Sequence, residues 1–325
     1  MRKLFALCLC LMLAAAMLPA GAEGTLKTGL AAVVSVTPTD AGERDGQTRN
    51  EVTIAAVTVD ESGVIVDCKI DGYRSDITFN TKGELTRDDT TPFQSKKEMG
   101  EAYGMGQIAP KGEWDAQAKG FEAYCVGKTL DQIKGIALTD GKATDEDILA
   151  TTTITIGDFV EAVAKAVEKA ADHGAKAGDT LYLTSVADMH SSKAATENKD
   201  GKAQLDVSYA AVTVKDNVIT SFVMDGVQPS ATFSAEGKVT SDTTAPVLSK
   251  LEKGNDYGMA PASKLEKGEW FQQAEGFGAY VTGKTLAEAG GIAVGEDGKP
   301  TDTDLLATTT IAIGSFVTLI TKIVP

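Results

Sequence analysis

An internal repeat constrains the fold of this chain more than any other feature. Segment 143–159 reads ATDEDILATTTITIGDF and segment 300–316 reads PTDTDLLATTTIAIGSF, and 12 of the 17 paired positions are identical. The two halves also share Tyr-Gly-Met at 103–105 and 257–259 and Lys-Gly-Glu-Trp at 111–114 and 267–270. A repeat of this length predicts one domain formed twice along the chain.

The repeat sets the expected domain boundaries. We expect a first copy over residues 23–172 and a second over 173–325, joined by the small-residue and glycine-rich stretch 170–178. Each copy has roughly 150 residues, enough to bury about 68–70% of its surface in a core of its own. So short a joint would keep the copies close together.

Residues 1–22 have the pattern of a signal peptide. Arg2 and Lys3 precede an apolar run over 4–18, and small residues at 20–22 form a cleavage site. The two cysteines in the run, Cys8 and Cys10, each follow a leucine and do not fit a lipid-acceptor site. No second apolar stretch has membrane-spanning length. The sequence therefore predicts a secreted or extracytoplasmic protein without a membrane span.

The net charge of the chain limits the kinds of molecule that it is expected to bind. The formal net charge is −15, or −17 once the two basic residues of the signal peptide are removed, and the remaining lysines are scattered. Such a chain repels phosphate backbones and anionic lipid surfaces. Nucleic acid is therefore not an expected partner.

Cys68 and Cys125 remain after cleavage, both in the first copy. An exported protein can oxidise such a pair. Phe222 and Val281 stand at the corresponding positions of the second copy, which indicates that both positions require apolar bulk. We favour two buried thiols over a disulfide bond.

Strands are expected early in each copy. Residues 51–59 and 64–70 are rich in β-branched side chains and flank the turn sequence 60–63, which predicts a hairpin. A short strand over 76–80 and a leading strand around 30–37 are also expected. Asp71-Gly72 and Asp225-Gly226 are interpreted as turns after a strand.

Helices are expected later in each copy. Residues 113–126 place apolar side chains at helical spacing, and Thr129 is expected to cap a short helix that follows. A final helix begins at about 156 and has its counterpart at about 313. Strands followed by helices predict an α+β fold, two tandem copies of an antiparallel sheet with packed helices.

The threonine runs at 151–153 and 308–310 lie at or just before the start of the final helix. Free backbone N–H groups there favour an anion, so a phosphate esterified to or bound beside a threonine would be well placed. In the alternative interpretation, Thr155 caps the helix and Asp158 completes a capping box. That alternative does not extend to the second copy, where Ala312 and Ser315 replace them.

These motifs together resemble the FMN-binding domain family, the exported flavin-carrying domains related to subunits of membrane pumps and Rnf-type complexes. Within that family the chain resembles the tandem-domain lipoproteins of Gram-positive bacteria that take part in extracellular electron transfer. The resemblance covers nearly the whole mature chain. It rests on the strand pairs ending in Asp-Gly, the Tyr-Gly-Met elements, the Glu-Trp-x-x-Gln-Ala helix starts at 113–118 and 269–274, and the threonine segments.

The resemblance implies a cofactor and its attachment site. In the family, a flavin transferase reads the motif Asp-x-x-Ser-Gly-Ala-Thr and joins FMN to the last threonine through a phosphoester. Asp147 and Asp304 take the aspartate position, and Ala-Thr-Thr stands where Ser-Gly-Ala is usual. The resemblance thus implies one covalent FMN per copy. The acceptors are Thr153 and Thr310, with Thr152 and Thr309 as alternatives.

Other residues near these motifs have two interpretations each. Tyr103, Met105, Tyr257 and Met259 lie beside glycines, where a backbone can approach a ligand, so we expect either flavin contact or loop packing. Trp114 and Trp270 are interpreted as helix anchors rather than flavin-stacking residues. The acidic stretch 145–147 is interpreted as a solvated loop, and no metal site is predicted.

Three functions are consistent with the sequence. The favoured one is an electron-transfer flavoprotein that receives electrons from a membrane-bound donor, and in which the flavin supplies the redox chemistry. The second is a non-redox adhesion or ligand-binding module on the same duplicated scaffold. The third, a terminal reductase, is disfavoured because the sequence offers no acid–base pair, so an electron carrier is expected rather than an enzyme.

Overall fold

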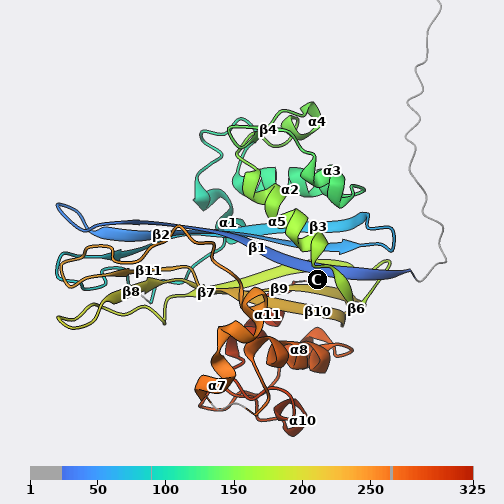
Figure 1. Cartoon of the computed structure of the whole chain (residues 1–325). Helices are drawn as coiled ribbons and strands as arrows, with labels where there is room; N and C mark the ends of the chain where they lie inside the picture. Colours follow the sequence, from blue (N-terminus) through green and yellow to red (C-terminus); the bar gives the residue numbers. More distant parts are fainter. Residues whose placement is uncertain (1–23, 89, 264–265, 325) are drawn as a thin grey trace, which may run out of the picture.

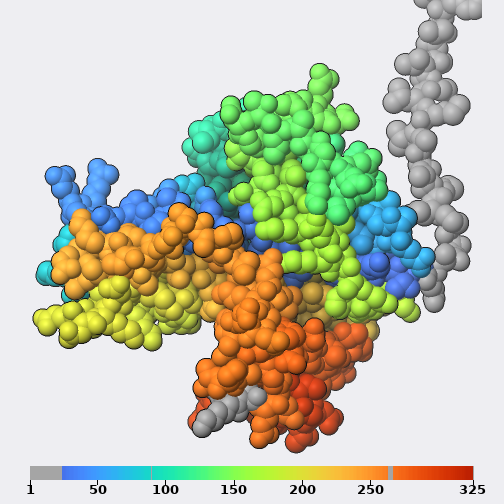
Figure 2. All heavy atoms as spheres, viewed as in Figure 1, coloured from blue at the N-terminus to red at the C-terminus, as the bar shows by residue number. Residues whose placement is uncertain are grey.

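A computed structural model of the chain describes residues 24–88, 90–263 and 266–324 (Figure 1). The predicted signal peptide therefore lies outside the described residues. The two largest sheets, both antiparallel, lie face to face in the middle of the molecule, and a group of helices covers the outer face of each. The space-filling view shows the two helical groups on opposite sides of the sheets (Figure 2). The predicted α+β class with antiparallel sheets is confirmed.

Four strands form the first sheet, in the order β3-β2-β1-β6. Their bounds are β1 Thr25–Thr39, β2 Gly46–Val59, β3 Ile65–Phe79 and β6 Ala171–Lys176. The predicted hairpin is present, and its turn is closed by a bond from Asp60 N–H to Val64 O of 2.9 Å. The separate strand expected at 76–80 is wrong, because β3 continues without a break and its Phe79 still pairs with Gly46 of β2.

The aspartate-glycine pairs do not form turns. Asp71 lies inside β3 and Asp225 inside β10 (Val218–Val227), and both carboxylates are buried. Asp71 Oδ1 accepts hydrogen bonds from Gly72 N at 2.7 Å and Lys97 N at 3.1 Å. Asp225 Oδ1 accepts in the same way from Leu251 N at 3.0 Å. The prediction failed because each carboxylate accepts from one backbone N–H in the first turn of the helix packed on its strand, which favours a buried position.

The helices of the first half pack on one face of this sheet. They are α1 Lys96–Met99, η1 Gly100–Tyr103, α2 Trp114–Cys125, α3 Leu130–Lys134, α4 Glu146–Leu149 and α5 Gly157–Glu168, with the small hairpin β4 Leu138–Thr139 and β5 Lys142–Ala143. Both long helices were predicted. Thr129 also caps α3 as expected, in a capping box with Gln132.

The second half has a similar order of elements, except that an isolated bridge between Val294 and Pro300 stands in place of the β4–β5 hairpin and a short helix over 259–263 is added. Its strands are β7 Thr180–Asp188, β8 Gly201–Gln204, β9 Asp206–Lys215, β10 and β11 Ser230–Phe233, arranged as β10-β9-β7 and β11-β8. Its helices are α6 Lys250–Lys253, η2 Gly254–Tyr257, α7 Met259–Ser263, α8 Trp270–Val281, α9 Leu286–Gly290, α10 Thr303–Leu306 and α11 Gly314–Thr321.

The predicted joint at 170–178 contains a strand. Within it, β6 pairs with β1, so the residues just after position 172 belong to the first sheet. Gly174 adopts a φ of 98°, and a Cβ there would lie 2.7 Å from Thr220 O on β10. Glycine is therefore required where this strand passes the second sheet.

The two halves share a core between their sheets. Ile54, Tyr73, Phe79, Tyr209 and Phe233 are fully buried there. The rings of Phe79 and Phe233 stack with their centroids 4.0 Å apart. The expectation of one separate core per copy is therefore incomplete, because each sheet buries its second face against the other.

Each sheet also has a core beneath its helices. Trp114 and Trp270 are buried there, edge-on to Phe159 and Phe316 with ring centroids 5.4 and 6.0 Å apart. Their interpretation as helix anchors fits these contacts. Cys68 and Cys125 are both free and buried in the first of these cores, as favoured.

Candidate functional site

The threonine run of the first half lies between α4 and α5 and is bonded to α2. Thr152 is buried and its hydroxyl donates to the Gln117 backbone carbonyl at 2.8 Å. The Thr153 N–H donates to Gln117 Oε1 at 2.8 Å, and the Thr153 hydroxyl lies 3.2 Å from the same oxygen. Buried Gln117 thus holds two consecutive threonines.

The second half contains the same arrangement. Thr309 is buried and donates to the Gln273 carbonyl at 2.9 Å. The Thr310 N–H and hydroxyl lie 2.8 and 3.2 Å from Gln273 Oε1. The four threonines named as possible acceptors therefore divide into a buried pair, Thr152 and Thr309, and a partly exposed pair, Thr153 and Thr310.

A glycine on each long helix allows this close approach. A Cβ at Gly120 would lie 2.5 Å from Thr151 Oγ1, and one at Gly276 would lie 2.8 Å from Thr308 Oγ1. Contacts below 3.0 Å are not tolerated, so any larger residue would push the run away from the helix.

The run does not face the start of α5 directly. Thr153 stands four positions before Gly157, the first residue of α5, and its polar groups are directed at α2. The alternative in which Thr155 caps the helix is wrong. Ile156 occupies the N-cap, without a side-chain hydrogen bond, and Thr155 is exposed. An apolar N-cap is favoured here because Ile156 is buried in the helix–sheet core.

A cavity of about 310 Å³ lies beside the run in the first half. Ile154, Thr155 and Gly157 form one wall, and β2, β3 and the segment from α1 to the start of α2 supply the others. Its aromatic and sulfur-containing wall consists of Tyr103, Met105, Trp114 and Phe159. The volume is at the lower end of the range for small-molecule sites, roughly 300–1,000 Å³.

The ammonium group of Lys96 lies over two of the aromatic rings in this cavity. Lys96 Nζ lies 5.3 Å from the Trp114 ring centroid and 5.8 Å from that of Tyr103. Burial lowers the pKa of Lys96. Among the described residues it forms neither a salt bridge nor a side-chain hydrogen bond. Three other charged residues line the cavity, Glu51, Arg74 and Asp158, and Arg74 pairs with Glu51 at 3.8 Å. Cation–π contact partly replaces the water that the ammonium has lost.

The lysine is repeated in the second half. Lys250 Nζ lies 4.9 Å from the Trp270 centroid and 5.5 Å from that of Tyr257, and burial lowers its pKa as well. Each half therefore contains the same cluster of one lysine, one tryptophan and one tyrosine.

The Tyr-Gly-Met elements are fixed by a glutamate at the start of the long helix. Glu113 accepts from Met105 N at 2.9 Å and Gly106 N at 2.7 Å. Glu269 accepts from Met259 N and Ala260 N, both at 3.0 Å. The four predicted residues Tyr103, Met105, Tyr257 and Met259 are half-buried and pack on the helix–sheet cores.

Asp147 and Asp304 do not join these clusters. Both are exposed, on α4 and α10, and their backbone N–H groups are capped by Asp145 and Asp302 at 2.8 and 2.9 Å. The acidic stretch 145–147 forms no metal-binding group in the part of the chain that the structure describes. No described helix has the length and apolar character needed to cross a membrane.

Sequence reasoning missed three pairs of residues that shape the site. Gln117 and Gln273 hold the threonines, Lys96 and Lys250 supply the charge, and Glu113 and Glu269 anchor the loops. Their recurrence at matching positions of the two halves is the signal that would have selected them.

A scan against models of protein families finds no match for this chain. Searches of curated proteins and of solved structures also find no similar protein. The resemblance to FMN-binding domains therefore rests on the residues quoted above.

Proposed function

We propose that this chain is an exported flavoprotein that carries FMN and transfers electrons, with one site in each of two FMN-binding-like copies. The observation that carries the proposal is the half-buried lysine in each half, unpaired among the described residues and placed over a tryptophan and a tyrosine. A cation kept from water in this way favours an anionic ligand. Aromatic walls suit a planar ring.

Thr153 and Thr310 are the better acceptors for a phosphoester. Attachment needs an accessible hydroxyl. Thr152 and Thr309 are buried, and their hydroxyls donate hydrogen bonds to backbone carbonyls. Thr153 and Thr310 are partly exposed, and in the described part of the chain their hydroxyls bond only to a side-chain amide oxygen, at 3.2 Å. Losing so long a hydrogen bond costs little.

Among the described residues, the side-chain partner of each of these hydroxyls is a glutamine amide oxygen. An amide oxygen is not a base, and threonine is a weak nucleophile without one. We therefore propose a separate flavin transferase. The new bond joins Thr153 Oγ1 to phosphorus, the hydroxyl proton is released, and a flavin dinucleotide would supply the FMN with a nucleoside monophosphate as leaving group.

Once bound, FMN would supply the electron chemistry. The protein would supply position and charge. Lys96 and Lys250 would stabilise negative charge on a ring held beside them, which favours its reduction. Glu113 and Glu269 would fix the loops that bear the tyrosine and methionine walls. A membrane-bound donor outside this chain would deliver the electrons.

Redox titration of the FMN-bound protein tests whether Lys96 and Lys250 stabilise negative charge on the flavin ring. Lys96→Met and Lys250→Met are each expected to lower the midpoint potential of half of the flavin, because each removes one cation. Lys119→Met, on the exposed side of α2, is the matched control and should leave the midpoint potential of the flavin unchanged. Unchanged potentials in both lysine variants, or protein that remains colourless in a host with a flavin transferase, would contradict the proposal.

A further inference from the structure

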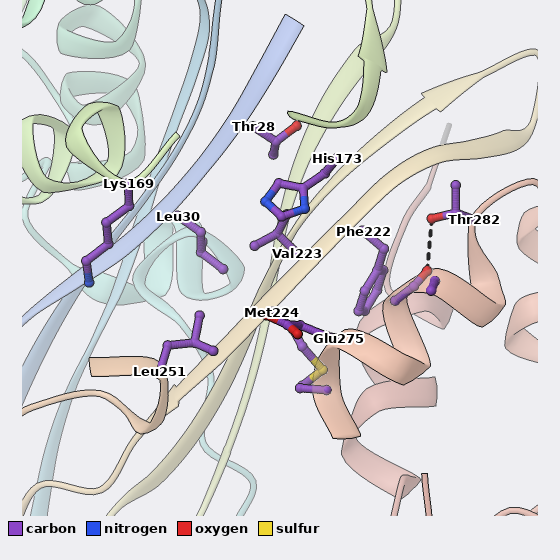
Figure 3. A pocket seen from close by; sticks show the side chains of 13 residues that line it. Thr28, Leu30, Lys169, His173, Phe222, Val223, Met224, Leu251, Glu275 and Thr282 are labelled. Carbon is purple, nitrogen blue, oxygen red and sulfur yellow. Dashed lines mark hydrogen bonds between the residues drawn. The ribbon is translucent and has the colours of Figure 1, made fainter. Parts of the chain in front are cut away.

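A second cavity, of about 670 Å³, lies between the two halves. It is bounded by β1, the end of α5, β6, β10 and α8, so both halves contribute to it. Figure 3 shows the His173 imidazole near Val223, with Leu30 of β1 on one side and Phe222 of β10 on the other. Its walls are mainly apolar, from Leu30, Phe222, Val223, Met224 and Leu251.

The corresponding space in the first half is filled. There Glu122 reaches from α2 to β3, where it accepts from Ile70 N at 2.6 Å and pairs with Lys97. By the alignment of the two halves, Gly278 stands at the position of Glu122 and Leu251 at that of Lys97. The second half thus replaces a partly buried ion pair by a glycine and an apolar side chain, and both of these residues line the cavity. At Gly278 itself α8 passes close to β10, since a Cβ there would lie 2.8 Å from Phe222 O.

Most polar groups around the cavity already have partners. Lys169 pairs with Glu252 at 2.7 Å, Thr28 bonds to Ser221 at 2.9 Å, and Thr282 donates to Gly278 O at 2.9 Å. His173 and Glu275 have no side-chain partner among the described residues.

The side chains of His173 and Glu275 determine which ligand charge the cavity favours. Burial lowers the pKa of His173, so its imidazole is neutral at pH 7, although Asp172 and Glu275 act in the opposite direction. Glu275 is exposed at the edge of the cavity. A neutral imidazole beside a carboxylate does not attract anions, and the chain as a whole is strongly acidic.

We propose that this cavity is a binding site for a small, largely apolar molecule that is uncharged or carries one positive charge. The ligand would place its apolar body against Phe222, Met224 and Leu251 and its polar end toward His173 and Glu275. The volume lies within the range of small-molecule sites, roughly 300–1,000 Å³, and the combination of apolar walls with few polar groups is typical of them. None of the residues that line this cavity belongs to the lysine clusters or threonine runs of the proposed flavin sites.

Binding of Nile red, a neutral apolar dye, tests this site in the full-length protein. Its fluorescence can be excited at wavelengths that flavin does not absorb. We expect saturable binding of one dye per chain. Ala279→Trp places an indole over the opening and should weaken binding by about tenfold or more. Ala279 is exposed, so the substitution leaves the core intact.

The repeat supplies a matched control. Ala123 is the corresponding exposed residue of the first half, where Glu122 fills the space, and Ala123→Trp should leave dye binding unchanged. The anionic dye anilinonaphthalene sulfonate should bind more weakly than Nile red, and Glu275→Gln should narrow that difference. Absence of saturable binding, equal effects of the two tryptophan variants, or preference for the anionic dye would overturn the proposal. None of these outcomes depends on bound flavin.

Discussion

Lys169 Nζ lies 2.7 Å from Glu252 Oε1, which joins the C-terminal end of α5 in the first half to the capping box of α6 in the second. The reciprocal contact joins Lys322, after α11, to Glu98 in the capping box of α1, at 2.5 Å. In both contacts, a lysine that follows the last helix of one half pairs with a glutamate in the first capping box of the other half. Together with the shared core between the sheets, these contacts make the two halves one structural unit.

Substituting Phe79 tests whether the halves unfold together. Its ring stacks on Phe233 in the shared core, so Phe79→Ala should reduce the free energy of unfolding by about 3–5 kcal/mol. Calorimetry of both proteins should show a single transition, moved to lower temperature in the variant. Two separate transitions in the wild-type protein would contradict a shared core.

The glutamine that holds the threonine run should be important for stability. Gln117→Leu removes the acceptor used by Thr153 N–H and should cost about 1–3 kcal/mol, because a half-buried donor loses its partner. Gln273→Leu should cost a similar amount in the second half. Urea denaturation measures both. Costs as small as that of the exposed Lys119→Met would show that these contacts contribute little.

The ion pair between the halves predicts a pH dependence. Burial acts to raise the pKa of Glu252, but the hydrogen bonds from Lys169 and Ser249 N–H outweigh it, so the pKa lies below the ordinary 4.5. The unfolded chain therefore takes up the proton first. The contribution of this carboxylate is present above pH 4.5 and is lost as pH falls through the lowered pKa.

Glu252→Gln should therefore reduce the loss of stability on acidification, when unfolding free energies are compared at pH 6 and at acidic pH. The exposed Glu43→Gln serves as the control. If the two variants lose stability in parallel with the wild-type protein, the pair does not link the halves energetically.

The sequence predicts local elements well because their signals are local. The turn at 60–63, the capping box at Thr129 and the apolar stripe of α2 each depend on residues a few positions apart. The packing of sheet on sheet was missed, although β2 contains a signal for it. Its residues 52–59 are all buried, and a nearly continuous apolar run is typical of a strand covered on both faces.

The site was only partly predictable, because several of its contacts join residues that are far apart in the sequence. The threonines were identified because they recur, but their contacts with Gln117 span about 36 positions and depend on how α2 packs. The position of Lys96 over Trp114 likewise depends on the path of the loop between them. Asp147 takes the aspartate position of the family motif, but it is exposed on α4, where its backbone N–H donates to the Asp145 cap.

The most direct test of the account is the intact mass of the protein exported by its own host. We predict a mass that exceeds that of the processed chain by two FMN phosphoesters. Thr153→Val and Thr310→Val should each remove one increment, while Thr151→Val, an exposed neighbour, should remove none. Native protein with neither a mass increment nor a tightly held flavin would contradict the account.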